Sequence, residues 1–232
     1  MDLDVLSAGA GKGLVESLQA GFTAQTGVSI HATFLAVGAI MEKLLAGEPC
    51  DVVILTAKQL ESLSRSGRVV ADSVVPLGRV ETALAVKTGE PIPDIADRDR
   101  LRRSLCAADA IYLPDAERST AGIHLVNMLR ALGIHADVEP RLRSYPGGAI
   151  AMRELAQSEA EHPIGCAQVT EIRATRGVAM LRALPQEFAL ATVYSVAVNA
   201  KAHQPELAYR FAALLTGPDA SDLRTSAGFG VP

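Results

Sequence analysis

The sequence predicts an α/β fold in which strands and helices alternate along the chain. Two observations carry this prediction. Short apolar or alternating stretches recur, and the segments between them hold apolar residues at helical spacing. In addition, residues 51–55 read Asp-Val-Val-Ile-Leu, which is typical of a strand buried on both faces of a parallel sheet.

The first part of the chain contains three such units. Strands are expected at residues 3–7, 28–34 and 51–55. A helix carries Leu14, Val15, Leu18 and Phe22, and a second carries apolar residues from Ile40 to Leu45 before Gly47-Glu48-Pro49 ends it.

A second α/β block follows. Its expected strands are 79–87, 110–113, 140–145, 163–167 and 189–199. Its expected helices are 97–107, 119–132, one from the Pro146-Gly147-Gly148 turn to about 158, a short one from 168, and two at about 205–215 and 219–225.

The two longest strands, 79–87 and 189–199, bracket a block of domain size. We therefore expect a first lobe made of residues 1–80 and 195–232, and a second lobe, 81–194, inserted into it. A single doubly wound sheet is the alternative that the pattern leaves open.

Composition excludes several classes of protein. The chain has 232 residues, of which 49% are hydrophobic and 21% charged, so intrinsic disorder is excluded. Its formal charge of −4 gives no basic footprint, and we expect no nucleic-acid partner. Three cysteines without close spacing predict neither disulfides nor a zinc site. Apolar stretches are too short for a membrane span.

The first residues, Met1-Asp2-Leu3-Asp4, do not resemble a signal peptide. If Met1 is the native start the protein is cytoplasmic; otherwise it is an exported protein whose signal peptide has been removed.

Motifs for common cofactors are missing. Gly11-Lys12 lacks the rest of a phosphate-binding loop, and Gly9 and Gly11 are followed by Leu14 where a dinucleotide fingerprint needs glycine. The five histidines show no metal-ligand spacing, and there is no Gly-x-Ser-x-Gly. We expect no cofactor and no metal.

The recurring feature is a strand, a turn of small residues and then a helix. It occurs at residues 7–13, 36–39, 119–122, 146–149 and 168–170. The first N–H groups of a helix have no intrahelical partner and lie at the positive end of its dipole, so each turn is a potential anion site if the turns meet.

Four stretches, 3–14, 33–51, 115–124 and 214–229, resemble the molybdate-binding type of extracytoplasmic solute-binding protein. The most specific is Gly47-Glu48-Pro49-Cys50-Asp51 with the strand that follows. The resemblance implies a two-lobe type II periplasmic-binding fold, with mixed sheets flanked by helices and two crossover strands. It also implies a small anion in the interlobe cleft, an ABC transporter as partner, and a periplasmic location; we expect a monomer.

The ligand-contacting turns depart from that family. Its molybdate-binding members place serines in the first two turns and a tyrosine in the late turn; this chain has Ala10, Val37 or Gly38, and Gln168. The loss of hydroxyl donors disfavours molybdate, and we expect a di- or tricarboxylate. The expected ligand-binding residues are Ser7, Ala8, Gly9, Ala10, Lys12, Val37, Gly38, Thr120, Ala121, Gly122, Pro146, Gly147, Gly148 and Gln168.

The alternative is an enzyme, because aconitate isomerases are similar to this branch of the family. Moving a proton and a double bond in a tricarboxylate requires a base near neutral pKa. The candidates are Ser7, Lys12, His124, Tyr145, Glu171 and Tyr194, and none is assigned as catalytic.

Overall fold

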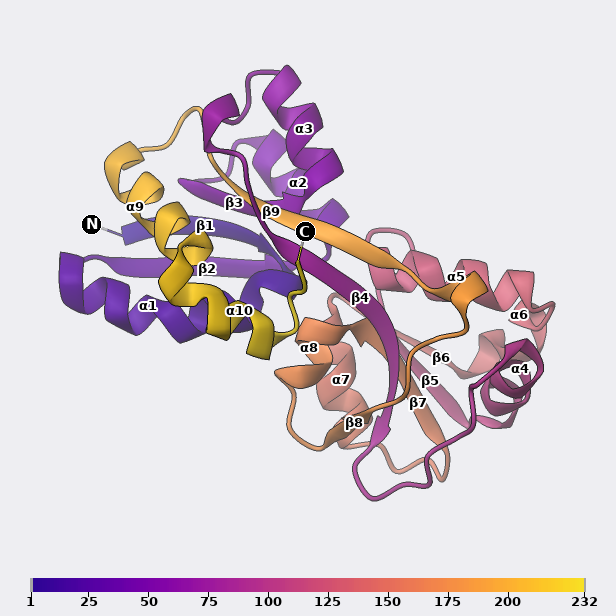
Figure 1. Ribbon diagram of the computed structural model, residues 1–232. Helices are drawn as coiled ribbons and strands as arrows, with labels where there is room; N and C mark the ends of the chain where they lie inside the picture. The colour runs from indigo at the N-terminus through magenta and orange to yellow at the C-terminus, as the bar shows by residue number, and fades with distance from the viewer. Residues whose placement is uncertain (1, 232) are drawn as a thin grey trace. The chain divides into compact units, whose positions relative to one another are not determined.

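The computed structural model describes residues 2–231 and divides into two compact units, Met1–Val80 with Thr192–Pro232, and Glu81–Ala191. Strand β4 (Val75–Lys87) leads from the first unit into the second, and β9 (Ala191–Val198) begins at the return (Figure 1). The sequence predicts lobe boundaries after residues 80 and 194, and the two compact units meet after residues 80 and 191. The α/β fold, with helices around mixed sheets, is confirmed.

The first unit contains strands in the order β2-β1-β3-β9. β1 (Asp2–Ala8) pairs in parallel with β2 (Ser29–Leu35) and β3 (Val52–Thr56), and β9 is antiparallel to β3. Its helices are α1 (Lys12–Thr26), α2 (Val37–Ala46), α3 (Ala57–Arg65), α9 (Pro205–Thr216) and α10 (Ser221–Ala227), with single 3-10 turns at Gly9–Gly11, Ala71–Ser73 and Pro218–Ala220.

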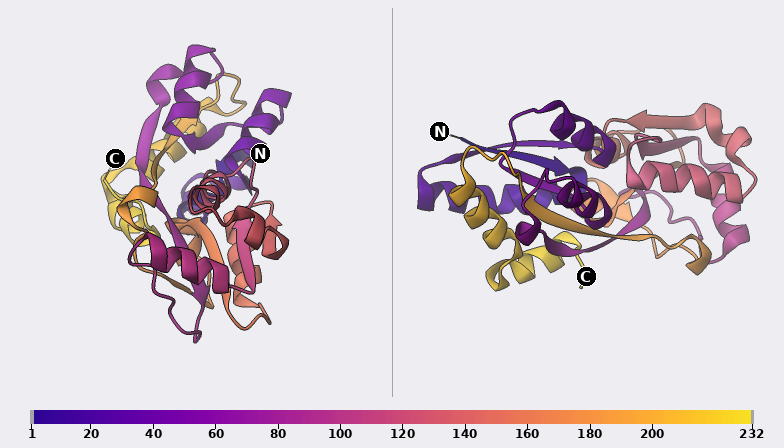
Figure 2. Two further views of the ribbon diagram at one scale, coloured as in Figure 1. Left: turned by 90° about the vertical axis from the view of Figure 1, so that its right-hand side faces the viewer. Right: turned by 90° about the horizontal axis from the view of Figure 1, so that it is seen from above.

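Aliphatic side chains fill the core of the first unit, as the scarcity of aromatic residues predicts. Both α9 and α10 pack on α1 (Figure 2). There Phe22 meets Phe211 edge to face, with ring centroids 5.1 Å apart. This contact holds the C-terminal helices against the first helix of the chain.

The second unit contains strands in the order β4-β7-β5-β6, and β8 (Val178–Met180) pairs with β4. β7 (Pro163–Gln168) and β6 (Leu142–Tyr145) are parallel to β5 (Ala110–Pro114), whereas β4 is antiparallel to β7. Its helices are α4 (Arg98–Ala107), α5 (Thr120–Ala131), α6 (His135–Val138), α7 (Gly148–Ala156) and α8 (Val169–Arg173), with 3-10 turns at Glu139–Arg141 and Gln186–Phe188.

Most expected elements are present with ends shifted by a few residues, and α3, α6 and β8 were not expected. β4 begins at Val75, whereas the sequence pattern predicts a start at 79. Pro76 and Gly78 are uncommon within strands, so the pattern does not reveal the first residues of β4. Gly78 has φ +150°, and a Cβ there would lie 2.6 Å from the Gly230 carbonyl oxygen. Glycine thus allows the C-terminal segment to pair with Arg79.

No helix within residues 2–231 is long and apolar enough to cross a membrane. Cys50 and Cys166 are buried free thiols and Cys106 is partly buried. Burial raises the pKa of the Cys50 and Cys166 thiols to about 12, so both are inert at neutral pH.

Asp51 joins three segments of the first unit. Its carboxylate accepts hydrogen bonds from the backbone N–H of Asp4 (3.0 Å) and of Gln204 (2.9 Å), and only 1% of the residue is exposed. Asp51 therefore fixes β1 and the start of α9 to the beginning of β3.

We predict that Asp51→Ala lowers the free energy of unfolding by about 2–4 kcal/mol, because two partly buried N–H groups lose a charged acceptor. Urea unfolding followed by circular dichroism measures this. The control Asp72→Ala, at an exposed aspartate of the same unit, should change stability by less than about 0.5 kcal/mol. An equal effect of both variants would contradict the role given to Asp51.

Candidate functional site

Two of the small-residue turns lie at one edge of the first unit's sheet. β1 and β2 are parallel with Ala8 opposite Leu35, so the segments that follow them leave the sheet side by side. The 3-10 turn Gly9–Gly11 leads into α1, and α2 begins at Val37. Among the described residues, no side chain caps this 3-10 turn, α1 or α2. The Lys12 N–H at the start of α1 donates to the Gly9 carbonyl oxygen. The donors available at this edge are therefore the first N–H groups of the 3-10 turn and of α2.

Ser7 and Lys12 are already engaged within this edge. The fully buried Ser7 hydroxyl donates to the Ala8 carbonyl oxygen at 2.8 Å. A Cβ on Gly11 would lie 2.6 Å from the Ser7 Oγ, so glycine at position 11 makes room for that hydroxyl. The Lys12 ammonium pairs with Glu16 and lies 5.1 Å from the centre of the Phe34 ring.

The other three turns lie at one edge of the second unit's sheet. β5, β6 and β7 are parallel, with Pro114 opposite Tyr145 and Tyr112 opposite Gly165. Their carboxyl ends therefore share an edge, and α5, α7 and α8 begin there. In open α/β sheets, ligands bind at the carboxyl ends of the strands.

At the start of α5, Ser119 caps the helix and Gly122 allows it to pack closely against the end of β5. The Ser119 hydroxyl accepts a hydrogen bond from the Gly122 N–H at 3.4 Å. A Cβ on Gly122 would lie 2.8 Å from the Asp115 carbonyl carbon and closer still to two carbonyl oxygens. Gly122 thus lets α5 approach the end of β5, and Ala121 is fully buried in the core of the unit. Of the predicted residues at this turn, Thr120 is therefore the one with an accessible surface.

Glu171 occupies the N-terminus of α7, a position that the sequence did not reveal. Its carboxylate accepts hydrogen bonds from the backbone N–H groups of Gln168 (3.2 Å), Gly148 and Ala149. A Cβ on Gly148 would lie 2.7 Å from Glu171 Oε1 and closer to two other carboxyl atoms. Gly148 is therefore required for this carboxylate to reach the helix.

Burial raises the pKa of Glu171 to about 7, although the three N–H groups lower it. The residue is 6% exposed. Glu171 is thus a group whose charge changes near neutral pH at the turn that was expected to bind an anion.

Further buried polar groups surround the start of α8. The Gln168 side-chain N–H donates to Thr82 Oγ1 at 3.2 Å. Gln168 and Glu171 are placed as a capping box at the start of α8, in which the Gln168 side chain would accept from the Glu171 N–H. Within residues 2–231, however, neither Gln168 Oε1 nor Thr170 Oγ1 has a partner at hydrogen-bond geometry. Unsatisfied buried polar atoms are uncommon and often mark functional sites.

The predicted binding residues thus fall into two groups, one in each unit. Ser7, Ala8, Gly9, Ala10, Lys12, Val37 and Gly38 lie at or beside the edge formed by β1 and β2. Thr120, Ala121, Gly122, Pro146, Gly147, Gly148 and Gln168 lie at the edge formed by β5, β6 and β7. Their contact with a ligand stays a prediction.

The other candidate bases are held in varied settings. His124 Nε2 makes a 2.8 Å hydrogen bond to the Phe188 carbonyl oxygen. The Tyr145 ring stacks on Tyr112, and burial raises the pKa of its hydroxyl. Tyr194 lies in the core at 1% exposure.

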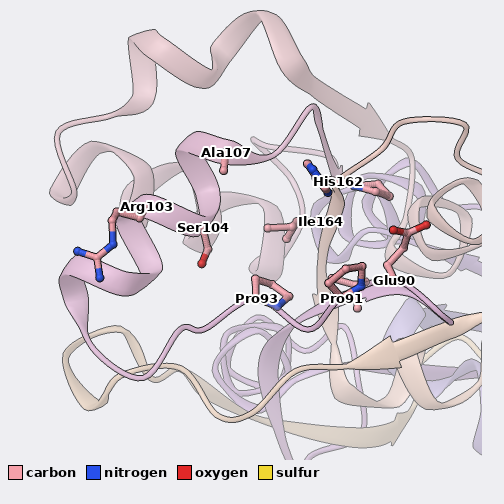
Figure 3. Close-up of a pocket in the computed structure, with 10 residues that line it drawn as sticks. Glu90, Pro91, Pro93, Arg103, Ser104, Ala107, His162 and Ile164 are labelled. Carbon is pink, nitrogen blue, oxygen red and sulfur yellow. The ribbon is translucent and has the colours of Figure 1, made fainter.

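A pocket of about 350 Å³ in the second unit lies away from the predicted turns (Figure 3). His162 and Glu90 stand at one end of it and Arg103 at the other (Figure 3). Its walls come from the amino end of β7, the end of β4 and one face of α4, and none of the predicted binding residues lines it. It is therefore separate from the carboxyl edge of the sheet.

Asp109, Glu161 and His162 form a group that could hold a metal ion, with candidate ligand atoms within 4.8 Å of one another. All three are exposed, and the Asp109 N–H donates to the His162 carbonyl oxygen at 3.3 Å. Sequence spacing could not reveal this group, because Asp109 lies far along the chain from the other two.

We predict that the free energy of unfolding falls as pH rises from about 4.5 to about 7. In that range the unfolded chain has released the Glu171 proton and the folded chain still holds it, which favours unfolding by about 3 kcal/mol in total. Urea unfolding at a series of pH values measures this. Glu171→Gln should lack this part of the slope and Glu154→Gln, at an exposed residue of α7, should keep it; parallel slopes in all three proteins would refute the prediction.

Sequence comparison gives three results. The family described as "Bacterial extracellular solute-binding protein" matches residues 3–230. An aconitate isomerase from Pseudomonas sp is 30% identical over 228 residues, which covers 94% of this chain and 84% of the relative. The molybdate-binding protein ModA of Escherichia coli (strain K12) is 22% identical over 231 residues, covering 99% and 89%.

Solved structures agree on the fold. The periplasmic molybdate-binding protein of Azotobacter vinelandii has a TM-score of 0.79 at 18% identity, with both chains fully covered. The sulfate-binding protein SubI of Mycobacterium tuberculosis H37Rv has a TM-score of 0.76 at 19% identity, covering 99% of this chain and 86% of its own. The fold is that of the type II periplasmic binding proteins, and the chain belongs to the bacterial extracellular solute-binding protein family.

Proposed function

We propose that the chain binds a small organic polyanion, a di- or tricarboxylate, through backbone N–H groups at the starts of its helices. In this proposal it is an extracytoplasmic binding protein that works as a monomer in the periplasm and delivers its ligand to an ABC transporter. The observation that carries the proposal is the pair of uncapped, small-residue helix starts at the β1–β2 edge.

The chemistry of this edge favours an anion. Orphan N–H groups and the helix dipole place positive potential there, and residues without bulky side chains let a ligand approach the backbone. The Lys12 ammonium is paired with Glu16, so backbone dipoles rather than an unpaired cation would hold the negative charge.

The same edge disfavours a compact oxyanion such as molybdate. Residues 8–11 and 36–39 contain no hydroxyl side chain, and the Ser7 hydroxyl already donates to the Ala8 carbonyl. In the second unit, the Gln168 amide donates to Thr82. A carboxylate ligand spreads its charge over separated groups and can use N–H donors that are farther apart. The higher identity to an aconitate isomerase than to ModA supports a carboxylate.

Calorimetric titration with molybdate, citrate, cis-aconitate and isocitrate tests the ligand and its place. We expect a tri- or dicarboxylate to bind most tightly, and Gly9→Asp or Gly147→Asp to weaken it about tenfold or more, because a fixed carboxylate repels the ligand at its donors. A Cβ on Gly147 meets no atom within 4 Å, so this variant should fold.

Gly21→Asp is the matched control, since position 21 is exposed on α1 and a Cβ there also meets nothing within 4 Å. It should bind like the wild type. Molybdate as the tightest ligand would overturn the carboxylate proposal, and unchanged affinity in both site variants would overturn the proposed position.

A second candidate function is aconitate isomerase activity, favoured by the 30% identity to that enzyme across 94% of the chain. The reaction removes a proton from one allylic carbon, shifts the double bond and returns a proton to the other carbon. Glu171 has a pKa suited to such a transfer, and we assign no catalytic base.

We expect NMR of the protein mixed with cis-aconitate to separate the two functions. Conversion to trans-aconitate, at a rate proportional to protein concentration, identifies the enzyme. Saturable binding with an unchanged cis-aconitate spectrum identifies the binding protein.

A further inference from the structure

Glu171 is an anion that the chain itself supplies to a helix N-terminus. Two donors of α7, the N–H groups of Gly148 and Ala149, are directed at its carboxylate. These donors belong to the same turn, residues 146–148, at which the ligand is expected. An ionised Glu171 and a bound anion would therefore compete for the same positive end of α7.

Among residues 2–231, no cation contributes to the charge state of this carboxylate. α8 packs against α7, β7 and β8. The titratable or charged side chains on these elements are Arg153 and Glu154 on α7, Cys166 on β7 and Arg173 on α8 itself. The three charged ones are exposed, Cys166 is a buried thiol that stays neutral, and only backbone N–H groups favour the ionised form of Glu171.

Protonation would change the turn in two ways that favour an anion. It removes a negative charge that is buried near the expected ligand, where repulsion is weakly screened. It also turns the carboxyl into an O–H donor and frees part of the capacity of the Gly148 and Ala149 N–H groups.

We propose that anion binding at the carboxyl edge of the second unit's sheet is coupled to the uptake of one proton by Glu171. The proton comes from solvent and binds one carboxylate oxygen, and no other bond changes. This inference rests on the proposed function. Since the Glu171 pKa is about 7 without ligand, affinity should fall by up to about tenfold per pH unit above that value.

The experiment is calorimetric titration of the whole chain with citrate, which has no double bond to move, and separately with molybdate. Each is done at pH 8 in HEPES and in Tris, buffers that differ in heat of ionisation. For the wild type we expect buffer-dependent heats equivalent to uptake of up to one proton, and a fall in affinity from pH 7 to pH 9. Glu171→Gln should bind with equal heats in both buffers and a flat pH profile, whereas Glu154→Gln should behave like the wild type.

The outcomes separate the two ideas. Binding with equal heats in both buffers, or a pH profile that Glu171→Gln leaves unchanged, would overturn the coupling and leave the proposed function standing. Absence of binding by either anion at any pH, in a protein that circular dichroism shows to be folded, would overturn the binding site and this inference with it.

Discussion

Backbone N–H groups at the starts of helices are the constraint on which the rest of this structure depends, because each needs an acceptor. The chain itself meets the need in two ways, and leaves one pair of helix starts without a side-chain cap. Thr56, Asp97 and Ser119 cap α3, α4 and α5 from the preceding residue. Glu171 serves α7 from a distant part of the chain. The 3-10 turn Gly9–Gly11 and α2, at neighbouring positions along one sheet edge, have no side-chain cap within the described residues. In the proposed function, their first N–H groups bind the ligand.

Small residues at these turns serve the protein's own contacts as often as they would serve a ligand. Gly11 makes room for the Ser7 hydroxyl, Gly122 for the backbone at the end of β5, and Gly148 for the Glu171 carboxylate. By contrast, a side chain at Gly147 would meet no neighbour. Packing therefore requires glycine at position 148 but not at position 147. A substitution at Gly147 can thus test the proposed binding site without disturbing the packing.

The alternation of strands and helices could be predicted from the sequence because it depends on local hydrophobic periodicity. The position of Glu171 could not, because its hydrogen bonds to Gly148 and Ala149 join segments that are separated along the chain. The same holds for Asp109 with His162, and for the start of β4, where Pro76 and Gly78 hide a strand stabilised by the C-terminal segment. α3 was not predicted from the spacing of apolar residues, although its start carries a local sequence signal, the Thr56–Gln59 capping box.

The sequence stretch that most resembles the family contributes to the stability of the fold rather than to the predicted binding site. Asp51 ends the Gly-Glu-Pro-Cys-Asp segment, and its carboxylate binds the backbone of Asp4 and Gln204 in the first unit's interior. These contacts are made within the chain and do not involve the predicted binding residues. In the proposed function, specificity instead depends on the few atoms at the helix starts, where this chain has Ala10, Val37 and Gln168. Under that proposal, family membership and ligand identity rest on different residues, and a change of ligand requires no change in the residues that hold the fold together.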